Sequence, residues 1–259
     1  MIASLLRRVA VVLALPAALI AVWWFASAGS ENFYFPPLST ILETFARLWF
    51  SPQAMHDAVP SLIRLSIGYV AAALLGIAIG IPVGASRSLR NLLEPVLEFL
   101  RAIPPPVLVP VLILFAGIGD EMKALVIVFG CIWPVLLNTV AGVRALDTVL
   151  AEVVRSYRIG ALARLWHFVL PGASPQIFAG LRQSLSIGII LMVISEMFAA
   201  SDGIGFALVQ YQRSFAIPEM WSGIILLGII GIVLSVIFRA IEAWILGWYH
   251  GLRRTQRAA

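Results

Sequence analysis

The sequence is poor in the charged residues with which soluble proteins cover their surfaces. Charged residues make up 12% of its 259 residues and apolar residues 61%, against roughly 25% and 45–50% in soluble globular domains. A soluble fold of this length would expose large apolar patches to water. The shortage of charge therefore argues against a soluble globular protein and predicts an all-α integral membrane protein, with lipid as its surrounding solvent.

Cysteine, lysine and histidine are also scarce. Cys131 is the only cysteine and lies in an apolar run, so we expect a small buried hydrophobe and no internal disulfide. The three histidines are far apart and lack metal-ligand spacing. Lys123 is the only lysine, and no Gly-x-x-x-x-Gly-Lys-Ser/Thr phosphate-binding loop occurs. We therefore predict a non-catalytic chain with no metal and no cofactor of its own.

Long apolar runs are what the sequence does have. We predict a single transmembrane domain over residues 1–259 with about six spans, each able to cover most of a hydrocarbon core about 30 Å thick. Pro104, Pro105, Pro106 and Pro110 predict that the third span is broken or kinked. The predicted spans are about 9–28, 65–85, 103–117, 125–143, 185–200 and 224–248.

Basic residues are unevenly distributed between the predicted loops. With the N-terminus in the cytoplasm, 13 of the 18 Lys and Arg residues fall in cytoplasmic segments, while Arg47, Arg64, Lys123 and Arg213 are external and Arg239 lies in the last span. Cytoplasmic loops of membrane proteins carry such an excess. We therefore predict a multi-pass protein of the bacterial inner (plasma) membrane with both termini cytoplasmic. Basic residues scattered between apolar runs also argue against a nucleic-acid partner.

The N-terminal segment allows two interpretations. Arg7-Arg8, an apolar run and Ala26-Ser27-Ala28 resemble a cleaved signal peptide. The run is long for a signal peptide, however, and Trp23-Trp24 is typical of an interfacial anchor. We expect a retained first span, followed by an amphipathic helix over residues 38–50 that lies on the outer surface.

Small residues recur at every fourth position of the second predicted span. Such a ridge lets another helix approach closely, so we predict a packing surface there. The residues are Gly68, Ala72, Gly76, Gly80 and Gly84.

Two ionisable residues fall in or near the predicted spans. Glu196 lies toward the outer end of the fifth, where a carboxylate is costly, so it is a candidate pathway or gating residue. An interfacial position or a structural hydrogen bond to a neighbouring backbone group are the alternatives. Arg239 is expected either to extend toward the interface or to pair with Glu242.

The longest predicted cytoplasmic segment, residues 144–182, indicates a bent basic hairpin. Polar and apolar residues alternate at helical spacing over residues 150–169. Gly160 interrupts this pattern, and Leu170-Pro171-Gly172 is predicted to end it. Two short helices joined in this way could lie on the anionic leaflet or dock into a groove on a partner protein.

The hairpin also carries a family resemblance. Glu152, Leu170 and Pro171 are spaced as in the coupling motif of ABC importer permeases, which reads Glu-Ala-Ala, a later Gly, then Leu-Pro. Residues 35–252 resemble the branch of that family that moves nitrate, sulfonates and taurine. The further similar stretches are residues 89–118, residues 136–144, Ser195-Glu196-Met197 and Gly203-Ile204-Gly205.

The chain departs from the family pattern within the motif itself. Val153 and Val154 stand where the family has alanines, and Arg158 stands where it has glycine. Gly160, two residues later, is therefore expected to supply the bend, since glycine tolerates positive φ.

The resemblance implies a permease subunit of an ATP-driven importer for a small anionic or polar organic solute of the sulfonate, nitrate or taurine kind. It implies a pathway formed between two permeases (a second copy or a paralogue), separate ABC ATPases that hold ATP and Mg²⁺, and an extracytoplasmic solute-binding protein. The residues that it assigns to ATPase coupling are Glu152, Arg155, Arg158, Gly160, Leu170 and Pro171. A secondary transporter or channel not driven by ATP is the alternative, although the chain shows no convincing internal repeat.

Overall fold

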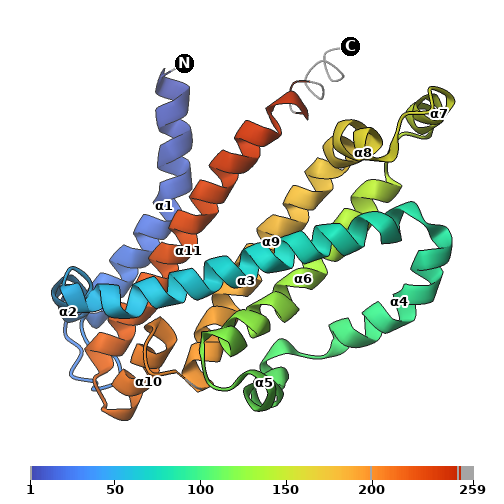
Figure 1. The fold of residues 1–259 in the computed structure, drawn as a ribbon. Coiled ribbons are helices and arrows are strands. Elements are labelled where there is room, and N and C mark those ends of the chain that lie inside the picture. Colours follow the sequence, from blue (N-terminus) through green and yellow to red (C-terminus); the bar gives the residue numbers. More distant parts are fainter. Residues whose placement is uncertain (1, 199, 250, 252–259) are drawn as a thin grey trace.

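The computed structural model describes residues 2–198, 200–249 and 251, and all regular elements in that part of the chain are helices (Figure 1). The all-α fold class is thereby confirmed. The elements are α1 (Ile2–Ser27), α2 (Leu38–Trp49), α3 (Pro52–Ala85), α4 (Arg87–Ala102), the 3₁₀ turn η1 (Pro105–Leu108), α5 (Val109–Ala116), α6 (Asp120–Arg144), α7 (Thr148–Ser156), α8 (Ala161–Arg164), the π-helical turn η2 (Leu165–Val169), α9 (Leu170–Phe198), α10 (Ile204–Arg213) and α11 (Ile217–Ile245).

Four of the described helices are long and apolar enough to cross a membrane, namely α3, α6, the continuous run Ala161–Phe198 and α11. The segments α4 and η1–α5 pass the same test only together, and they are bent by 83°. Prolines explain this break, because α4 ends at Ala102 and the residue before Pro104 is disfavoured in a helix. Helix α5 has eight residues, about 12 Å of helix, so it is too short to cross the membrane alone. The shorter apolar helix Ala14–Ser27 lies in α1, so a total of six spans stays a prediction.

The ridge of small residues packs against α6, as predicted. A Cβ atom added at four of its glycines would lie 2.7–2.9 Å from an α6 side chain, and Ala72 is fully buried. In each case the glycine meets the residue 59 positions later in the chain, so α3 and α6 run parallel in a constant register. The pairs are Gly68 with Ile127, Gly76 with Val135, Gly80 with Thr139 and Gly84 with Val143.

Because α3 and α6 run parallel, the segment between them must cross back along the bundle. The chain leaves α3 at Ala85 and must return to the opposite end of the bundle before α6 begins at Asp120. The bent pair α4 and η1–α5 makes this return, with α5 near the end of the bundle where α6 begins (Figure 1).

Helix α9 covers the face of α6 around Cys131. The thiol is fully buried and its Sγ lies 3.3 Å from the carbonyl oxygen of Ser184, while the Ser184 hydroxyl donates to the carbonyl of Cys131 at 3.0 Å. This confirms the prediction of a buried cysteine. Leu191 and Met192 of α9 complete the same core with Val126 of α6.

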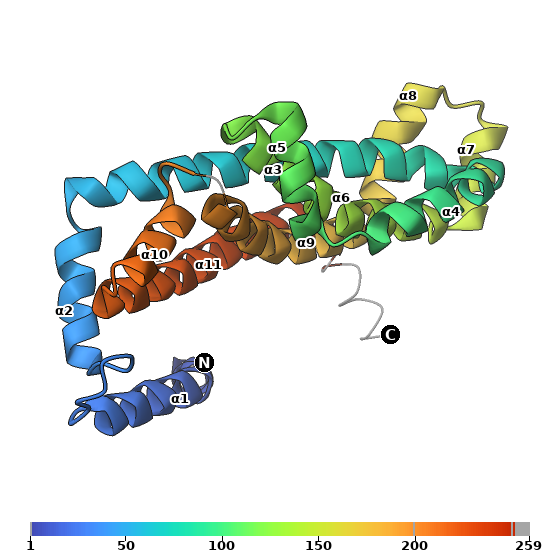
Figure 2. The ribbon, with the colours of Figure 1, turned by 90° about the horizontal axis from the view of Figure 1, so that it is seen from below.

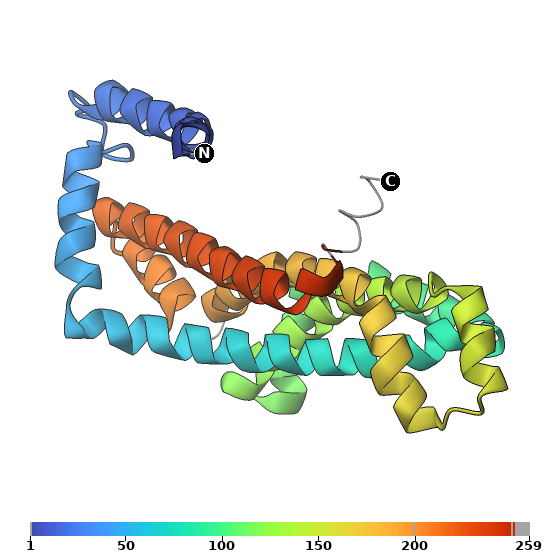
Figure 3. The same cartoon turned by 90° about the horizontal axis from the view of Figure 1, so that it is seen from above.

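Helix α2 is amphipathic and crosses the end of the bundle, joining α1 to α3 (Figures 2 and 3). Leu38 and Ile41 are buried, and the indole nitrogen of Trp49 donates to the Ser222 hydroxyl of α11 at 3.1 Å. The amphipathic helix predicted over residues 38–50 is therefore confirmed. Helix α1 stands apart from α3, α6 and α9 in the same views.

One sequence-based expectation about the later helices is wrong, and one of the two alternatives for Arg239 is excluded. Leu170-Pro171-Gly172 does not end a helix, because α8, η2 and α9 form one continuous run and the π-helical turn before Pro171 accommodates its missing N–H. Glu242 does not pair with Arg239 but with Arg182 of α9, which reaches it from the neighbouring helix. Arg239 instead donates to the Ser235 carbonyl at 3.3 Å.

Candidate functional site

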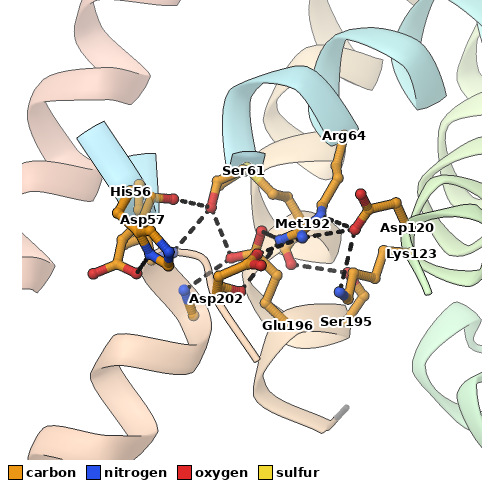
Figure 4. Close-up of polar contacts among 12 residues, drawn as sticks. His56, Asp57, Ser61, Arg64, Asp120, Lys123, Met192, Ser195, Glu196 and Asp202 are labelled. Atoms are coloured by element: carbon orange, nitrogen blue, oxygen red, sulfur yellow. Dashed lines mark hydrogen bonds and ion pairs between the residues drawn. The ribbon is translucent and has the colours of Figure 1, made fainter. Parts of the chain in front are cut away.

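Arg64 anchors a buried polar cluster at the end of the bundle that lies opposite the α7–α8 hairpin (Figure 4). Its side chain on α3 is 4% exposed. Its Nε donates to Asp120 at the start of α6 at 2.6 Å, and its Nη2 donates to the Asp202 carboxylate at 2.5 Å. Its Nη1 donates to Glu196 near the end of α9 at 3.0 Å. One guanidinium thus ties together α3, α6, α9 and the loop before α10.

Glu196 is the most enclosed acid of this cluster, with a side chain that is 0% exposed. Its Oε1 accepts from Arg64, and its Oε2 accepts the backbone N–H of Gly205 and lies 2.9 Å from the Ser61 hydroxyl. The Ser61 oxygen accepts the N–H of Ile204 at 2.9 Å. The first turn of α10 is therefore held by side chains of α3 and α9, as N-terminal N–H groups require.

Gly203 and Gly205 allow the Glu196 carboxylate to approach the backbone at the start of α10 closely. Gly203 has φ of 110°, and a Cβ there would lie 2.6 Å from the carboxyl carbon of Glu196. A Cβ on Gly205 would lie 2.5 Å from the carbonyl oxygen of Val193. The Gly203-Ile204-Gly205 and Ser195-Glu196-Met197 stretches noted in the sequence thus form one structural unit.

The cluster holds two basic and three acidic side chains. Lys123 of α6 is 3% exposed and contacts Asp120 at 3.4 Å. Asp120 is 70% exposed and Asp202 28%, whereas Glu196 is fully buried. Removing Arg64 would leave the buried carboxylate of Glu196 without compensation, which costs more than the intact pair contributes. The cluster therefore fixes the relative positions of the helices around it. A hollow of about 490 Å³ beside it is lined by Arg64, Lys123, Asp120 and Asp202 among others.

The sequence interpretation placed Arg64 and Lys123 in external loops, and this is wrong. Both lie on long helices and are buried, because α3 begins at Pro52 and α6 at Asp120. The error came from ending each predicted span at its first charged residue. A usable indication was nevertheless present, since a buried acid such as Glu196 needs a basic partner at the same depth.

A second hollow of about 640 Å³ lies between the start of α3 and α10, and it is lined by His56, Asp57, Gln210 and Tyr211 among others. Burial raises the pKa of the Tyr211 hydroxyl above its usual value of 10, and the nearby carboxylates of Asp57 and Glu219 add to this effect. The hydroxyl therefore stays protonated at neutral pH and can act as a hydrogen-bond donor.

The other candidate site is the hairpin of α7 and α8, which projects from the opposite end of the molecule (Figure 1). Glu152, Arg155, Arg158 and Gly160 are all exposed there, whereas Leu170 and Pro171 begin α9 and are partly buried. The Glu152 side chain forms no hydrogen bond or ion pair with the described residues. Exposed apolar side chains surround these residues, namely Val149 (67%), Leu150 (55%), Tyr157 (78%), Leu162 (70%) and Trp166 (61%).

The turn of the hairpin depends on Arg158 rather than on Gly160. Arg158 has φ of 47°, in the left-handed region, whereas Gly160 has φ of −58° and is the residue that precedes α8. The expectation that Gly160 supplies the bend is therefore wrong. The left-handed position coincides with the place of the family glycine, which explains why glycine suits it.

Three features define the class of this protein. They are several apolar spans, a buried charge cluster at one end, and a projecting, partly apolar hairpin at the other. It is a polytopic helical membrane protein with a surface suited to a protein partner. The chain belongs to the family described as binding-protein-dependent transport system inner membrane component, whose profile matches residues 72–247.

Three relatives match between 71% and 94% of the chain. It is 31% identical to the taurine transport system permease protein TauC of Escherichia coli, over 94% of this chain and 91% of that protein. It is also 31% identical to the putative aliphatic sulfonates transport permease protein SsuC of Bacillus subtilis, over 91% and 86% of the two chains. The nitrate import permease protein NrtB of Synechocystis is 31% identical over 71% and 66%.

The fold has counterparts among solved structures. A chain of the MetNI methionine ABC transporter in inward-facing conformations superposes with a TM-score of 0.57 at 17% identity, over 80% of this chain and 95% of that one. A chain of an amino acid ABC transporter gives 0.54 at 15% identity, over 83% and 97%. At these identities the likeness concerns the fold alone.

Proposed function

We propose that this chain is the membrane-spanning permease of an ATP-driven importer and that a separate ATPase engages its α7–α8 hairpin. The observation that carries the proposal is the surface of the hairpin. Tyr157, Leu162 and Trp166 are more than half exposed, beside the unpaired acid Glu152. Apolar side chains beyond the end of a membrane bundle need a protein or lipid surface to cover them.

The distribution of charge supports an orientation with the hairpin in the cytoplasm. Around the hairpin end, Arg87, Arg144 and Arg164 are exposed. At the opposite end, Arg64 and Lys123 are buried against carboxylates, and Arg47 pairs with Glu219 at 3.2 Å. Arg213 is exposed at that opposite end as well. Most of the free positive charge nevertheless gathers at the hairpin end, as the positive-inside rule expects of a cytoplasmic face in the inner membrane. Under this orientation the N-terminus of α1 is cytoplasmic, while Arg253, Arg254 and Arg257 lie outside the described residues.

The proposed pathway lies between two permeases, a second copy or a paralogue. Exposed apolar side chains on α4, α5 and α11 support a helical partner in addition to lipid. The hollows near α10, at the end opposite the hairpin, would then face an extracytoplasmic solute-binding protein. The names of the relatives support a small polar or anionic solute, of the taurine, sulfonate or nitrate kind.

Reconstitution tests this function. The permease would be placed in vesicles with ATP, together with an ABC ATPase and a solute-binding protein from the same cell, and uptake of labelled taurine, ethanesulfonate and nitrate would be measured. We expect uptake of one of these solutes only with ATP and the binding protein present. The Glu152→Ala variant is expected to lose at least about tenfold in uptake, which corresponds to 1.4 kcal/mol. Glu43→Ala, which removes an exposed acid of α2 at the end of the molecule opposite the hairpin, is the control.

Two results would contradict the proposal. Uptake that follows an ion gradient without ATP would favour a secondary transporter, and uptake with neither ATP nor a gradient would favour a channel. Wild-type uptake by Glu152→Ala, combined with wild-type uptake by a Leu162→Asp/Trp166→Asp variant, would remove the hairpin from the coupling mechanism.

A further inference from the structure

A groove lined by arginines lies where three membrane-spanning helices end. Its volume is about 370 Å³, and its walls come from the ends of α3 and α6, the starts of α4 and α7, and the segment Arg164–Val169 before α9. Its basic lining consists of Arg87, Arg90, Arg144 and Arg164, and the lining contains no acidic side chain. Four arginines therefore border one small hollow whose lining holds no acidic side chain.

These arginines are not used to stabilise the fold. Within the described residues, the side chains of Arg87, Arg144 and Arg164 have no hydrogen-bond or ion-pair partner, and the Arg90 side chain makes one long contact of 3.5 Å to the Gly84 carbonyl. Arg90 and Arg144 also border a smaller pocket of about 160 Å³ that holds Glu94 and Glu98. Glu98, however, already pairs with Arg101 at 2.5 Å, so the groove keeps an excess of positive charge.

Apart from Thr148, the rest of the lining is apolar, and its position along the helices indicates the depth of the groove in the membrane. Val143, Phe168 and Val169 contribute to it, and Gly84 and Val143 belong to the last turns of α3 and α6. A groove at the ends of the spans lies at the level of lipid headgroups. Arginines above an apolar floor match a ligand that joins a phosphate to hydrocarbon chains.

We propose that this groove binds the headgroup phosphate of an anionic phospholipid, with the start of an acyl chain on its apolar floor. Residues 152–163, at the tip of the hairpin, contribute nothing to the lining, so the site is separate from the surface proposed for the ATPase. A bound lipid would bridge the link between α3 and α4, the end of α6 and the base of the hairpin. The inference rests on the membrane placement in the proposed function, but not on ATP coupling.

Native mass spectrometry of the purified transporter complex tests the inference. Complexes from nanodiscs that contain phosphatidylglycerol and phosphatidylcholine would be compared for retained phosphatidylglycerol per permease chain. We expect Arg144→Gln and Arg164→Gln each to lower retention about fivefold, and the double variant about 30-fold. The matched control is Arg155→Gln/Arg158→Gln, which removes two arginines from the same hairpin outside the groove and should retain phosphatidylglycerol like the wild type.

The outcomes separate the possible ligands. Equal retention by the groove and control variants would overturn the site. Displacement of phosphatidylglycerol by inorganic phosphate at equal molar concentration would overturn the lipid assignment in favour of a free anion. Loss of the ATPase from the complex with unchanged lipid retention would assign the groove to the ATPase instead. None of these results depends on whether the complex transports its solute.

Discussion

At the scale of single residues, Arg64 connects more segments of the chain than its place in the sequence indicates. It joins Asp120, Glu196 and Asp202, which belong to three separate segments. Buried charges of this kind depend on their partners, because the desolvation of the remaining ions is otherwise uncompensated. Arg64 is thus a positioning residue for the end of the bundle where α10 begins.

We expect Arg64→Leu to lower the free energy of unfolding by about 3–5 kcal/mol, because it leaves the buried carboxylate of Glu196 without its cation. Tryptophan fluorescence of the purified chain in detergent, followed through denaturant unfolding, measures the change. Arg47→Leu is the matched control, since Arg47 is 69% exposed and exposed ion pairs contribute about 0–1 kcal/mol. Equal losses for the two variants would show that the Arg64 cluster does not stabilise the fold.

The turn of the hairpin gives a second prediction at this scale. Arg158 has φ of 47°, so Arg158→Gly should remove backbone strain and stabilise the purified chain by roughly 1 kcal/mol. Gly160→Ala should change stability little, because Gly160 has an ordinary φ and no atom lies within 4 Å of an added Cβ. The midpoint of thermal unfolding checks both. The opposite ranking would mean that Gly160 forms the bend after all.

At the scale of helices, the contact between α3 and α6 depends on the absence of side chains. We expect Gly80→Ala to cost about 1–3 kcal/mol, because its Cβ would lie 2.7 Å from the Thr139 Cβ and 3.0 Å from the Leu136 carbonyl oxygen. Gly228→Ala is the control, since α11 leaves open space at that position. Denaturant unfolding of both variants measures the difference. A Gly80→Ala variant as stable as Gly228→Ala would contradict the observed packing.

The sequence predicted those elements whose physical cause is local. The apolar character of the long helices, the amphipathic pattern of α2 and the four-residue ridge of α3 were predicted correctly, whereas the number of six spans stays a prediction. The continuity of α9 through Pro171 and the burial of Arg64 were missed. Both depend on partners distant in the chain or on backbone adjustment, such as the turn η2 and the acids of α6 and α9. Neither is visible in a local pattern.

The positive φ at Arg158 is a further feature that the local sequence pattern did not predict. Glycine is the residue that commonly marks such positions, and its replacement by arginine removes the usual indication from the sequence. The bend was therefore assigned to the nearby Gly160. The family resemblance had nevertheless located the correct position, because it aligned Arg158 with the glycine of the motif.

At the scale of the whole molecule, the account requires opposite ends on opposite sides of the membrane. Single cysteines at positions 56, 213 and 158 test this, since the native Cys131 is fully buried. A membrane-impermeant maleimide added to intact cells should label His56→Cys and Arg213→Cys but not Arg158→Cys. In permeabilised cells all three should be labelled. Labelling at position 158 in intact cells would invert the proposed orientation.

The central claim is that a separate ATPase covers the exposed tip of the hairpin. The photo-reactive residue benzoylphenylalanine, placed at position 157, 162 or 166 of the assembled transporter, measures this contact directly. We predict that irradiation attaches the ATPase covalently at one or more of these positions. At Phe50, which is 84% exposed at the opposite end of the molecule, no such product should form. Attachment of the ATPase at position 50, or at none of the hairpin positions, would contradict the account.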